Sequence, residues 1–111
     1  MAPRAVIFGC AGTGLSADER RLYADADPWG FILFARNVAD PDQLRRLTSE
    51  MRAAVGRNAP MLVDQEGGRV ERLTAPNWRA WRPALDECQR LPTTSLRVQA
   101  MRLRYRLIGR Q

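Results

Sequence analysis

Three short apolar runs alternate with two amphipathic stretches in the first part of the chain. The runs cover residues 5–10, 30–35 and 60–63. They are continuous rather than alternating with polar residues, which is typical of strands buried on both faces of a parallel sheet. Strands that alternate with helices are joined by right-handed parallel crossovers. The pattern therefore predicts an α/β fold, either an open sheet or a barrel.

Both intervening stretches carry helix start signals. Ser16 and Glu19 have capping-box spacing and predict a short helix from about Ala17 to Ala24. Asp40 before Pro41 places an N-cap and a first-turn proline at the start of the second helix. The apolar face of this second helix follows spacings of three and four residues: Leu44, Leu47, Met51 and Val55.

The pattern changes after residue 72. Prolines, tryptophans and scattered arginines over residues 73–94 indicate an irregular segment with at most one short helix. Residues 95–108 are predicted to be helical, because apolar side chains form a stripe at helical spacing. The predicted stripe contains Leu96, Ala100, Leu103 and Leu107, with Met101, Tyr105 and Ile108 beside it.

Length and composition narrow the class of protein. The 111 residues fit one domain, and 45% hydrophobic with 27% charged residues is ordinary for a soluble protein. No apolar run approaches the roughly 20 residues that span a bilayer, and the N-terminus lacks a secretory signal. We therefore expect a cytoplasmic location and no membrane partner. Without histidine, and with Cys10 and Cys88 far apart, we expect free thiols, no metal site and no cofactor.

The net charge of +6 is confined to the end of the chain. Residues 1–87 hold 12 arginines and all 12 acidic residues, whereas residues 88–111 hold six arginines and no acid. All 18 basic residues are arginine, which favours genome composition over selection for phosphate contacts. We expect no nucleic-acid partner. The competing interpretation is a phosphate- or membrane-binding helix; the preferred one is a solvated outer helix face: Arg97, Arg102, Arg104, Arg106 and Arg110.

The third apolar run ends in a cluster of polar residues and glycines. Asp64 follows this predicted strand, and the carboxyl ends of strands carry the active site in α/β barrels and open sheets. A carboxylate there can accept hydrogen bonds from two neighbouring hydroxyls of a sugar. Gly67 and Gly68 permit a sharp turn and close approach of a ligand. Arg72 can return over the pocket and donate a charge-assisted pair of hydrogen bonds.

A purely structural interpretation of this cluster stays open at this point. Asp64 would then cap the loop, and Arg69 or Arg72 would pair with Glu66 or Glu71 in solvent. Residue spacing alone does not separate this interpretation from a binding site.

Residues 64–72, Asp-Gln-Glu-Gly-Gly-Arg-Val-Glu-Arg, resemble the signature of bacterial β-N-acetylhexosaminidases of glycoside hydrolase family 3. Four further segments are similar to the same family. Residues 11–15 resemble its first βα unit, residues 30–37 its second strand, and residues 42–44 its second helix. Residues 101–108 resemble the helix before its fourth strand. The resemblance covers nearly the whole chain, although the loop over residues 73–94 matches poorly.

The resemblance implies a (β/α)8 TIM-type barrel of which this chain holds about three βα units and one further helix. We therefore expect an incomplete barrel, with residues 1–111 forming a truncated N-terminal family 3 domain. Members remove N-acetylglucosamine from peptidoglycan fragments in the cytoplasm. By position, Asp64 would bind hydroxyls of the non-reducing sugar, and Arg72 would hold the same subsite. Arg36 and Asn37 would lie near the pocket, with ordering of the strand-end loops as their preferred role.

The family's catalytic groups have no counterpart in this sequence. Its Lys-His pair, its histidine acid/base and its aspartate nucleophile are missing, and the chain contains neither histidine nor lysine. Asp64 and Glu66 lie two positions apart on one loop, so they would flank the same side of a sugar and cannot act as the two carboxylates of a retaining glycosidase. We therefore expect no catalytic residue, and Asp64 and Arg72 as substrate-binding residues.

The preferred hypothesis is thus a truncated glycosidase whose partner is a small carbohydrate. A non-catalytic remnant or weak carbohydrate-binding fragment is the first alternative, and a basic nucleic-acid-binding protein is the second. Trp78 and Trp81 could form a sugar-stacking platform, but packing beneath the loop is the preferred interpretation.

Overall fold

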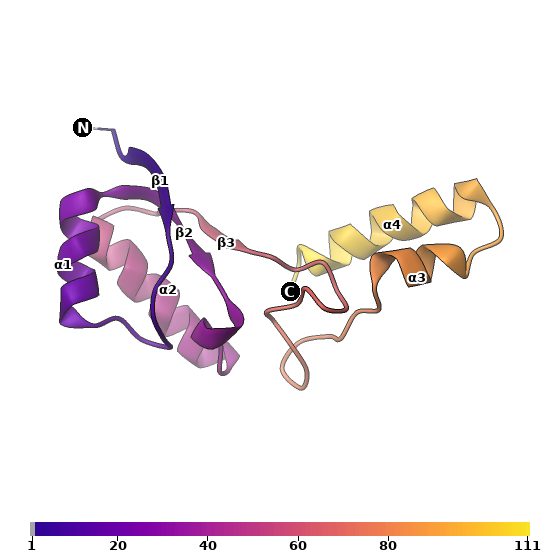
Figure 1. Ribbon diagram of the computed structural model, residues 1–111, viewed down its shortest axis with the longest axis horizontal. Coiled ribbons are helices and arrows are strands. Elements are labelled where there is room, and N and C mark those ends of the chain that lie inside the picture. The colour runs from indigo at the N-terminus through magenta and orange to yellow at the C-terminus, as the bar shows by residue number, and fades with distance from the viewer. Residues whose placement is uncertain (1) are drawn as a thin grey trace. The chain divides into compact units, whose positions relative to one another are not determined.

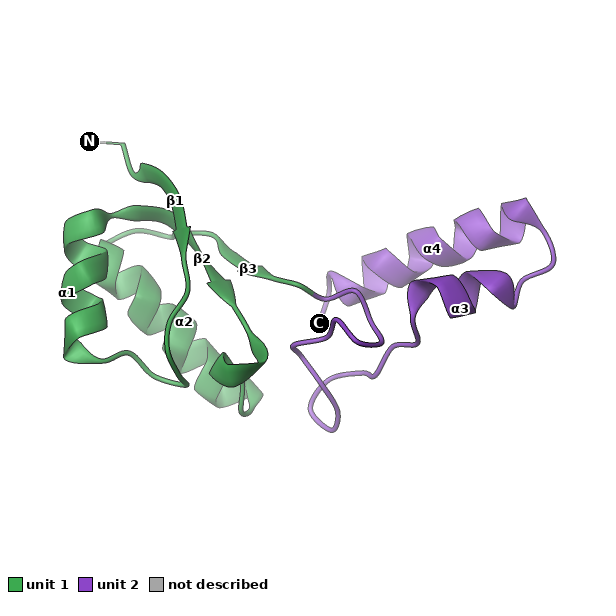
Figure 2. Cartoon of the chain, in the orientation of Figure 1, with its two compact units in different colours: residues 1–64 green, residues 65–111 purple. Residues whose placement is uncertain are grey.

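A computed structural model describes residues 2–111 of the protein (Figure 1). The chain divides into two compact units (Figure 2). Unit 1 ends at Asp64 and contains the predicted strands; unit 2 comprises residues 65–111 and contains the C-terminal helices.

Unit 1 has the predicted order of strand, helix, strand, helix, strand. Its elements are β1 (Arg4–Phe8), α1 (Ala17–Ala26), β2 (Pro28–Leu33), the 3-10 turn η1 (Ala35–Asn37), α2 (Pro41–Val55) and β3 (Met61–Val63). The second strand begins and ends two residues earlier than its apolar run predicts. It stops at Leu33 because the Asn37 side chain accepts a hydrogen bond from the Phe34 N–H at 2.9 Å, which turns the chain out of the sheet.

The sheet is wound in one direction only. Its strand order is β1-β2-β3 and both pairings are parallel, with Phe31 paired to Phe8 on one side and to Met61 on the other. Helices α1 and α2 pack on the same face (Figure 1). This winding occurs in a β/α barrel and also in one half of an open, doubly wound sheet. The α/β prediction is confirmed, and the sheet is consistent with an incomplete barrel.

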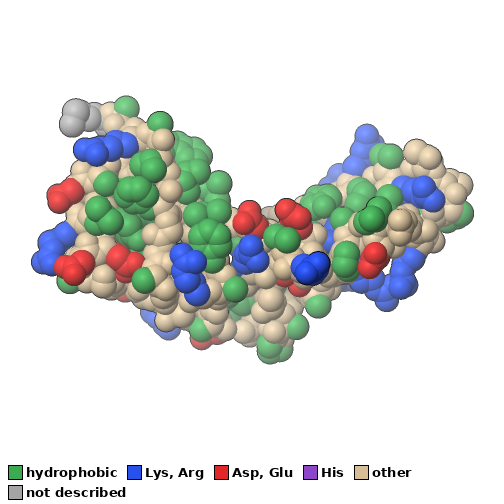
Figure 3. Space-filling view, viewed as in Figure 1, with side chains coloured by type: hydrophobic (Ala, Val, Ile, Leu, Met, Phe, Trp, Pro, Cys, Tyr) green, Lys and Arg blue, Asp and Glu red, His purple; other side chains and the backbone are tan. Residues whose placement is uncertain are grey.

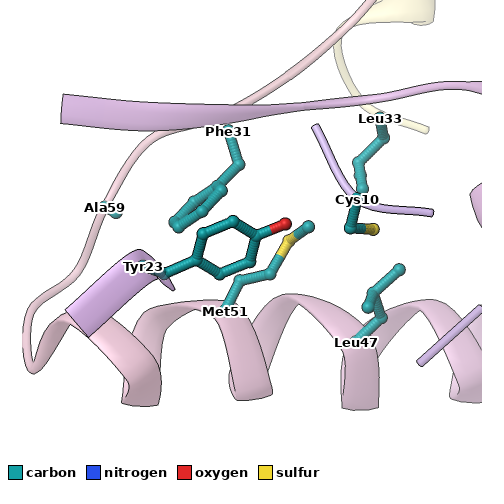
Figure 4. Packing of buried hydrophobic residues seen from close by; sticks show 7 residues of the cluster. All are labelled: Cys10, Tyr23, Phe31, Leu33, Leu47, Met51 and Ala59. Atoms are coloured by element: carbon teal, nitrogen blue, oxygen red, sulfur yellow. The ribbon is translucent and has the colours of Figure 1, made fainter. Parts of the chain in front are cut away.

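The core of unit 1 lies between β2 and the two helices (Figure 4). Phe31 points from the sheet towards Tyr23 of α1 and Met51 of α2, and Leu33 points towards Cys10 and Leu47; all these side chains are buried. The rings of Tyr23 and Phe31 meet edge to face at 5.0 Å between centroids. The Tyr23 hydroxyl donates to the Gly9 carbonyl at 2.6 Å, and burial raises the pKa of Tyr23 to about 12.

The opposite face of the sheet has a different environment. Because side chains alternate along a strand, the paired Ile32 and Leu62 point away from the face that carries Phe31. Ile7 lies on the same side and is 42% exposed. Within the described residues of unit 1, no helix covers this face. In a closed barrel it is the face that lines the interior.

The predicted caps of both helices in unit 1 are present. Ser16 and Glu19 form a reciprocal capping box at the start of α1. The Asp40 side chain accepts from the Gln43 N–H at 2.8 Å, and Pro41 occupies the first turn of α2. Helix α2 ends at Gly56, whose φ of 66° is left-handed.

The Glu19 carboxylate predicts a pH dependence of stability. It accepts N–H bonds from Ser16 at 2.9 Å and from Ala11 at 2.8 Å, and these bonds hold its pKa below the ordinary 4.5. Since the folded pKa is depressed, its stabilising effect is complete above 4.5 and is lost as the pH falls through the folded pKa. We expect Glu19→Gln to lower the melting temperature most at pH 6 and progressively less as the pH falls below 4.5.

Thermal melts of both proteins between pH 3 and pH 6 test this expectation. The matched control is Asp25→Asn on the exposed side of α1, which should shift the melting temperature little at any pH. An equal Glu19→Gln effect at every pH would show that the charge of the carboxylate is not involved.

Unit 2 contains α3 (Ala84–Gln89) and α4 (Thr94–Ile108), which pack against each other. The prediction of an irregular segment with one short helix is therefore confirmed, as is the C-terminal helix, which begins after an N-cap at Thr93. Within residues 2–111, no helix combines the length and apolar character that crossing a membrane requires.

The predicted packing stripe of α4 is correct at Ala100 and Leu107, which are half-buried, but wrong at its other two positions. Leu96 and Leu103 are 43% and 55% exposed, whereas Arg104 is buried. Apolar side chains thus lie among charged ones on the surface over α3 and α4 (Figure 3). The more buried residues again follow spacings of three and four: Arg97, Ala100, Met101, Arg104, Leu107 and Ile108.

Arg104 also corrects the expectation that the arginines of α4 form a solvated face. Its guanidinium has hydrogen-bond acceptors inside unit 2, which allows a charged side chain to take an interior position. Arg97 is half-buried and donates from Nε to the Leu91 carbonyl at 2.9 Å. The other arginines of this segment are exposed: Arg102, Arg106 and Arg110.

Candidate functional site

The carboxyl ends of the three parallel strands lie at one edge of unit 1. β1 leads into the segment 9–13, β2 leads into η1, and β3 leads directly into Asp64. Asp64 follows Val63 without an intervening turn and is exposed. The structure therefore places this carboxylate at the strand end, where a bound hydroxyl could reach it, as the apolar run before it indicates.

Asn37 orders the loops at this edge. It is fully buried, and its Nδ2 donates to the carbonyls of Cys10 at 3.1 Å and Gly12 at 2.8 Å. Gln43 of α2 extends the network, because its Nε2 donates to the Asn37 carbonyl at 2.9 Å and the Thr13 carbonyl at 2.8 Å. The preferred interpretation of Asn37 as a loop-ordering residue agrees with these contacts. The role of Gln43 was not predicted, because its partners lie on a loop distant in sequence.

Arg36 has a similar structural use. Its Nε donates to the Cys10 carbonyl at 3.1 Å, and its guanidinium lies 4.7 Å from the centroid of the Phe34 ring. Beside it, a hollow of about 440 Å³ at the end of β1 is also lined by Glu19 and Tyr23. Both cysteines are free, as expected. Burial raises the pKa of the Cys10 thiol, which disfavours the thiolate that nucleophilic attack requires.

In unit 2, Gln65 closes the loop that follows Asp64. Its Oε1 accepts from the Arg72 N–H at 3.0 Å and the Leu73 N–H at 3.1 Å, and its Nε2 donates to the Leu73 carbonyl at 2.8 Å. These three bonds fix the backbone from which the Arg72 side chain projects. Sequence reasoning gave Gln65 no role. The sequence did contain a signal: the amide of Gln65 can both donate and accept hydrogen bonds, whereas the ionised carboxylates on either side of it can only accept.

The two glycines form the turn at the tip of this loop. Gly67 and Gly68 have φ angles of 89° and 65°, which other residues rarely adopt. The Glu66 and Gly67 N–H groups both donate to the Val70 carbonyl, at 2.8 and 3.1 Å. A Cβ on Gly67 would lie 2.1 Å from Nη2 of Arg104. The predicted sharp turn is present, but the close approach at Gly67 is to the chain's own arginine rather than to open ligand space.

The remaining polar residues of the loop are partly engaged within unit 2. Glu71 accepts from the Trp81 N–H at 2.8 Å, while Arg69 is exposed and Arg72 is half-buried. The Trp81 ring lies 4.8 Å from the Arg79 guanidinium, and its Nε1 donates to the Gln111 side chain at 3.0 Å. Trp81 therefore packs within unit 2. This agrees with the preferred interpretation, packing beneath the loop, rather than with a sugar-stacking platform.

The described residues include no cluster suited to a metal ion. Within residues 2–111, no group of three or more His, Cys, Asp or Glu side chains is placed to hold one.

A parallel sheet wound in one direction, with a carboxylate directly at the end of β3, is the arrangement expected of the N-terminal portion of a β/α barrel. Comparison with known proteins gives the particular relatives. The chain is 48% identical over 70 residues to a β-hexosaminidase of Alkalilimnicola ehrlichii and 47% identical over 68 residues to one of Idiomarina loihiensis. Each match covers 61% of this chain but only 20% and 21%, respectively, of the relative. The chain thus spans about a fifth of their length.

Solved structures agree with this resemblance. NagZ from Neisseria gonorrhoeae in complex with N-trifluoroacetyl-D-glucosamine matches with a TM-score of 0.71 and 32% identity, over 78% of this chain and 26% of that one. A glycoside hydrolase family 3 β-N-acetylglucosaminidase from a Paenibacillus species matches with a TM-score of 0.57 and 34% identity, over 62% and 14%. No family model matches the chain. The resemblance to family 3 β-N-acetylhexosaminidases is confirmed for the part covered.

Proposed function

We propose that the chain contributes part of the sugar-binding subsite of a family 3 β-N-acetylhexosaminidase. The observation that carries this proposal is the position of Asp64 directly after β3 of a parallel sheet wound in one direction. The similarity to β-hexosaminidases at 45–48% identity supports it, as does the bound N-acetylglucosamine analogue of one structural relative. On this proposal residues 1–111 correspond to the N-terminal part of the family's catalytic domain.

The chemistry of the site is recognition of hydroxyl groups. The exposed Asp64 carboxylate can accept hydrogen bonds from two adjacent sugar hydroxyls. By the family resemblance, Arg72 on the loop that Gln65 closes would donate to the same sugar. The proposed substrate is an N-acetylglucosaminyl peptidoglycan fragment, hydrolysed in the cytoplasm by the complete enzyme. The nucleophile and the acid/base are not among these residues, so the chain's own contribution is binding and orientation of the sugar.

The nucleic-acid alternative loses support from the structure. Of the arginines that suggested it, Arg104 is buried and Arg97 is bonded to a backbone carbonyl. The exposed set that remains is smaller and shares the helix surface with exposed apolar side chains such as Leu103.

Binding of N-trifluoroacetyl-D-glucosamine to the 111-residue chain tests the proposal, with fluorine NMR as the readout. We expect millimolar affinity for the wild type, since only part of the subsite is present, corresponding to about −4 kcal/mol. Asp64→Asn and Arg72→Ala should each weaken binding about tenfold, because hydrogen bonds to a charged group contribute roughly 1.5–3 kcal/mol.

Arg69→Ala is the matched control, because Arg69 is an exposed arginine of the same loop. It should bind the sugar as the wild type does. If the wild type gives no shift or broadening of the fluorine signal, or if Asp64→Asn binds equally well, the proposal is wrong.

A further inference from the structure

The interior of unit 2 contains a charged side chain that the proposed function has not used. Arg104 of α4 is only 2% exposed, and acceptors from three different segments surround its guanidinium. Nη2 donates to the Glu66 carbonyl at 2.5 Å and to the Arg82 carbonyl at 2.6 Å, and Nη1 donates to the Glu87 carboxylate of α3. One planar group thus joins α4 to the loop of residues 65–73, called the glycine loop below, to the segment before α3 and to α3 itself.

Packing alone does not account for an arginine at this position. Burying a guanidinium costs several kcal/mol unless its hydrogen bonds are made, and a well-packed apolar residue often serves stability equally well. Nε of Arg104 is buried without a partner in the described structure. What an apolar residue could not supply is a rigid donor pointing at several backbone carbonyls at once. The geometry therefore indicates that Arg104 defines a backbone conformation.

The conformation that it defines is that of the glycine loop. Arg104 holds the Glu66 carbonyl, and the adjacent Gly67 is packed so closely on Nη2 that a Cβ would be 2.1 Å away. Gly68 donates to the Trp81 carbonyl at 2.9 Å, and the Arg104 guanidinium lies 5.7 Å from the Trp81 ring centroid. Both glycines and Trp81 thus lie around one guanidinium, which fixes the tip of the loop.

The base of the same loop is fixed independently. Gln65 binds the backbone of Arg72 and Leu73 through three hydrogen bonds, as described above. With the tip held by Arg104 and the base held by Gln65, the backbone between Gln65 and Leu73 has little freedom. The direction of the Arg72 side chain is a consequence of both restraints.

We infer that Arg104 is a positioning residue for the glycine loop: it fixes the backbone of residues 65–73 and thereby sets the direction of the Arg72 side chain. This inference rests on the proposed function for its effect on sugar affinity. Its effect on the loop itself does not depend on any ligand.

Two readouts on the 111-residue chain test the inference. Amide hydrogen exchange and ¹H–¹⁵N shifts of Gly67, Gly68 and Arg72 report on the loop, and fluorine NMR titration with N-trifluoroacetyl-D-glucosamine reports on the site. We expect Arg104→Met to accelerate exchange at both glycines about tenfold, to shift the Arg72 amide, and to weaken sugar binding about tenfold. Arg104→Lys should show each of these changes to a smaller extent, because an ammonium keeps the charge but cannot reach all three acceptors.

Matched controls separate this role from general destabilisation. Arg102→Met and Arg106→Met remove exposed arginines from the same helix and should leave both readouts unchanged. Glu87→Gln keeps the two backbone acceptors of Arg104 and should have a smaller effect than Arg104→Met. If Arg104→Met loses its far-ultraviolet circular dichroism, Arg104→Lys and Glu87→Gln decide the question, since both retain a polar partner.

The outcomes are distinguishable. Unchanged amide exchange and shifts in a folded Arg104→Met variant would overturn the inference, as would a loosened loop with unaltered sugar affinity. A wild-type chain that does not bind the sugar while its loop responds to Arg104→Met would overturn the proposed function and the link to Arg72, leaving Arg104 with a loop-ordering role only.

Discussion

The 111-residue chain, purified alone, is expected to show no measurable hydrolysis of a chromogenic β-N-acetylglucosaminide. General acid–base catalysis contributes roughly 10²–10⁴-fold, and a retaining glycosidase also needs a nucleophile on the other side of the bond. The chain contains no histidine, and its candidate site offers Asp64 with Glu66 only two positions away. We therefore expect a rate at least about 10⁴-fold below that of a full-length relative such as the Idiomarina loihiensis β-hexosaminidase.

The assay compares wild type, Asp64→Asn and the full-length relative, all prepared from the same host lacking its own hexosaminidase. A trace of activity that is equal in wild type and Asp64→Asn identifies a contaminant. Turnover by the wild type that Asp64→Asn removes would contradict our assignment, because it would show that the chain carries catalytic groups of its own. The fluorine NMR titration complements this assay, since sugar binding without turnover is the combination that the proposed function requires.

Truncation of Phe31 is expected to unfold unit 1 or nearly so. Phe31 is fully buried at the centre of the core, against Tyr23 and Met51 (Figure 4). Phe→Ala substitutions in protein cores cost about 3–5 kcal/mol. The whole stability of a 64-residue unit is about 3–10 kcal/mol at ordinary values per residue. Phe31→Ala should therefore lower the urea midpoint strongly or abolish the cooperative transition of unit 1.

Urea titrations followed by circular dichroism measure this effect. Leu22→Ala is the control, since Leu22 is 53% exposed and its truncation should cost well under 1 kcal/mol. Similar midpoints for the two variants would show that the packing of Phe31 between sheet and helices does not stabilise unit 1. The helix signal of unit 2 should persist in Phe31→Ala, because the residues of that unit form a separate compact body.

One face of the sheet and both of its edges are uncovered within the described part of unit 1. Ile7 is exposed, and Ile32 and Leu62 are half-buried on the side that faces the interior in a closed barrel. Strands β1 and β3 also lie at the two edges of the sheet. A complete hexosaminidase barrel, which takes roughly 250 residues, would cover this face and pair these edges. On the proposed function, the catalytic groups belong to the part of the relatives that this chain does not match.

The sequence was sufficient for the elements that depend on short-range interactions. The capping box at Ser16 and the Asp40-Pro41 helix start act over three or four residues, and both are present in the structure. Apolar runs located the three strands, with shifts of about two residues at their ends. The strand-end position of Asp64 follows from the same local pattern, so this candidate residue could be predicted without knowledge of the fold.

Residue patterns alone left open whether the sheet was an open one or a barrel; the resemblance indicated a barrel, and the one-directional winding agrees with it. The residue patterns did not predict interactions between residues that are far apart in the sequence. Helix α4 was predicted, but its packed face only in part, because Arg104 takes an interior position only when Glu66, 38 residues away, supplies a carbonyl. An apolar stripe predicts the packed face of a helix only when all the buried side chains of that helix are apolar. Here Arg104, whose Nη1 and Nη2 atoms are hydrogen-bonded, is buried while Leu103 is exposed, and only the tertiary structure could bring its acceptors together.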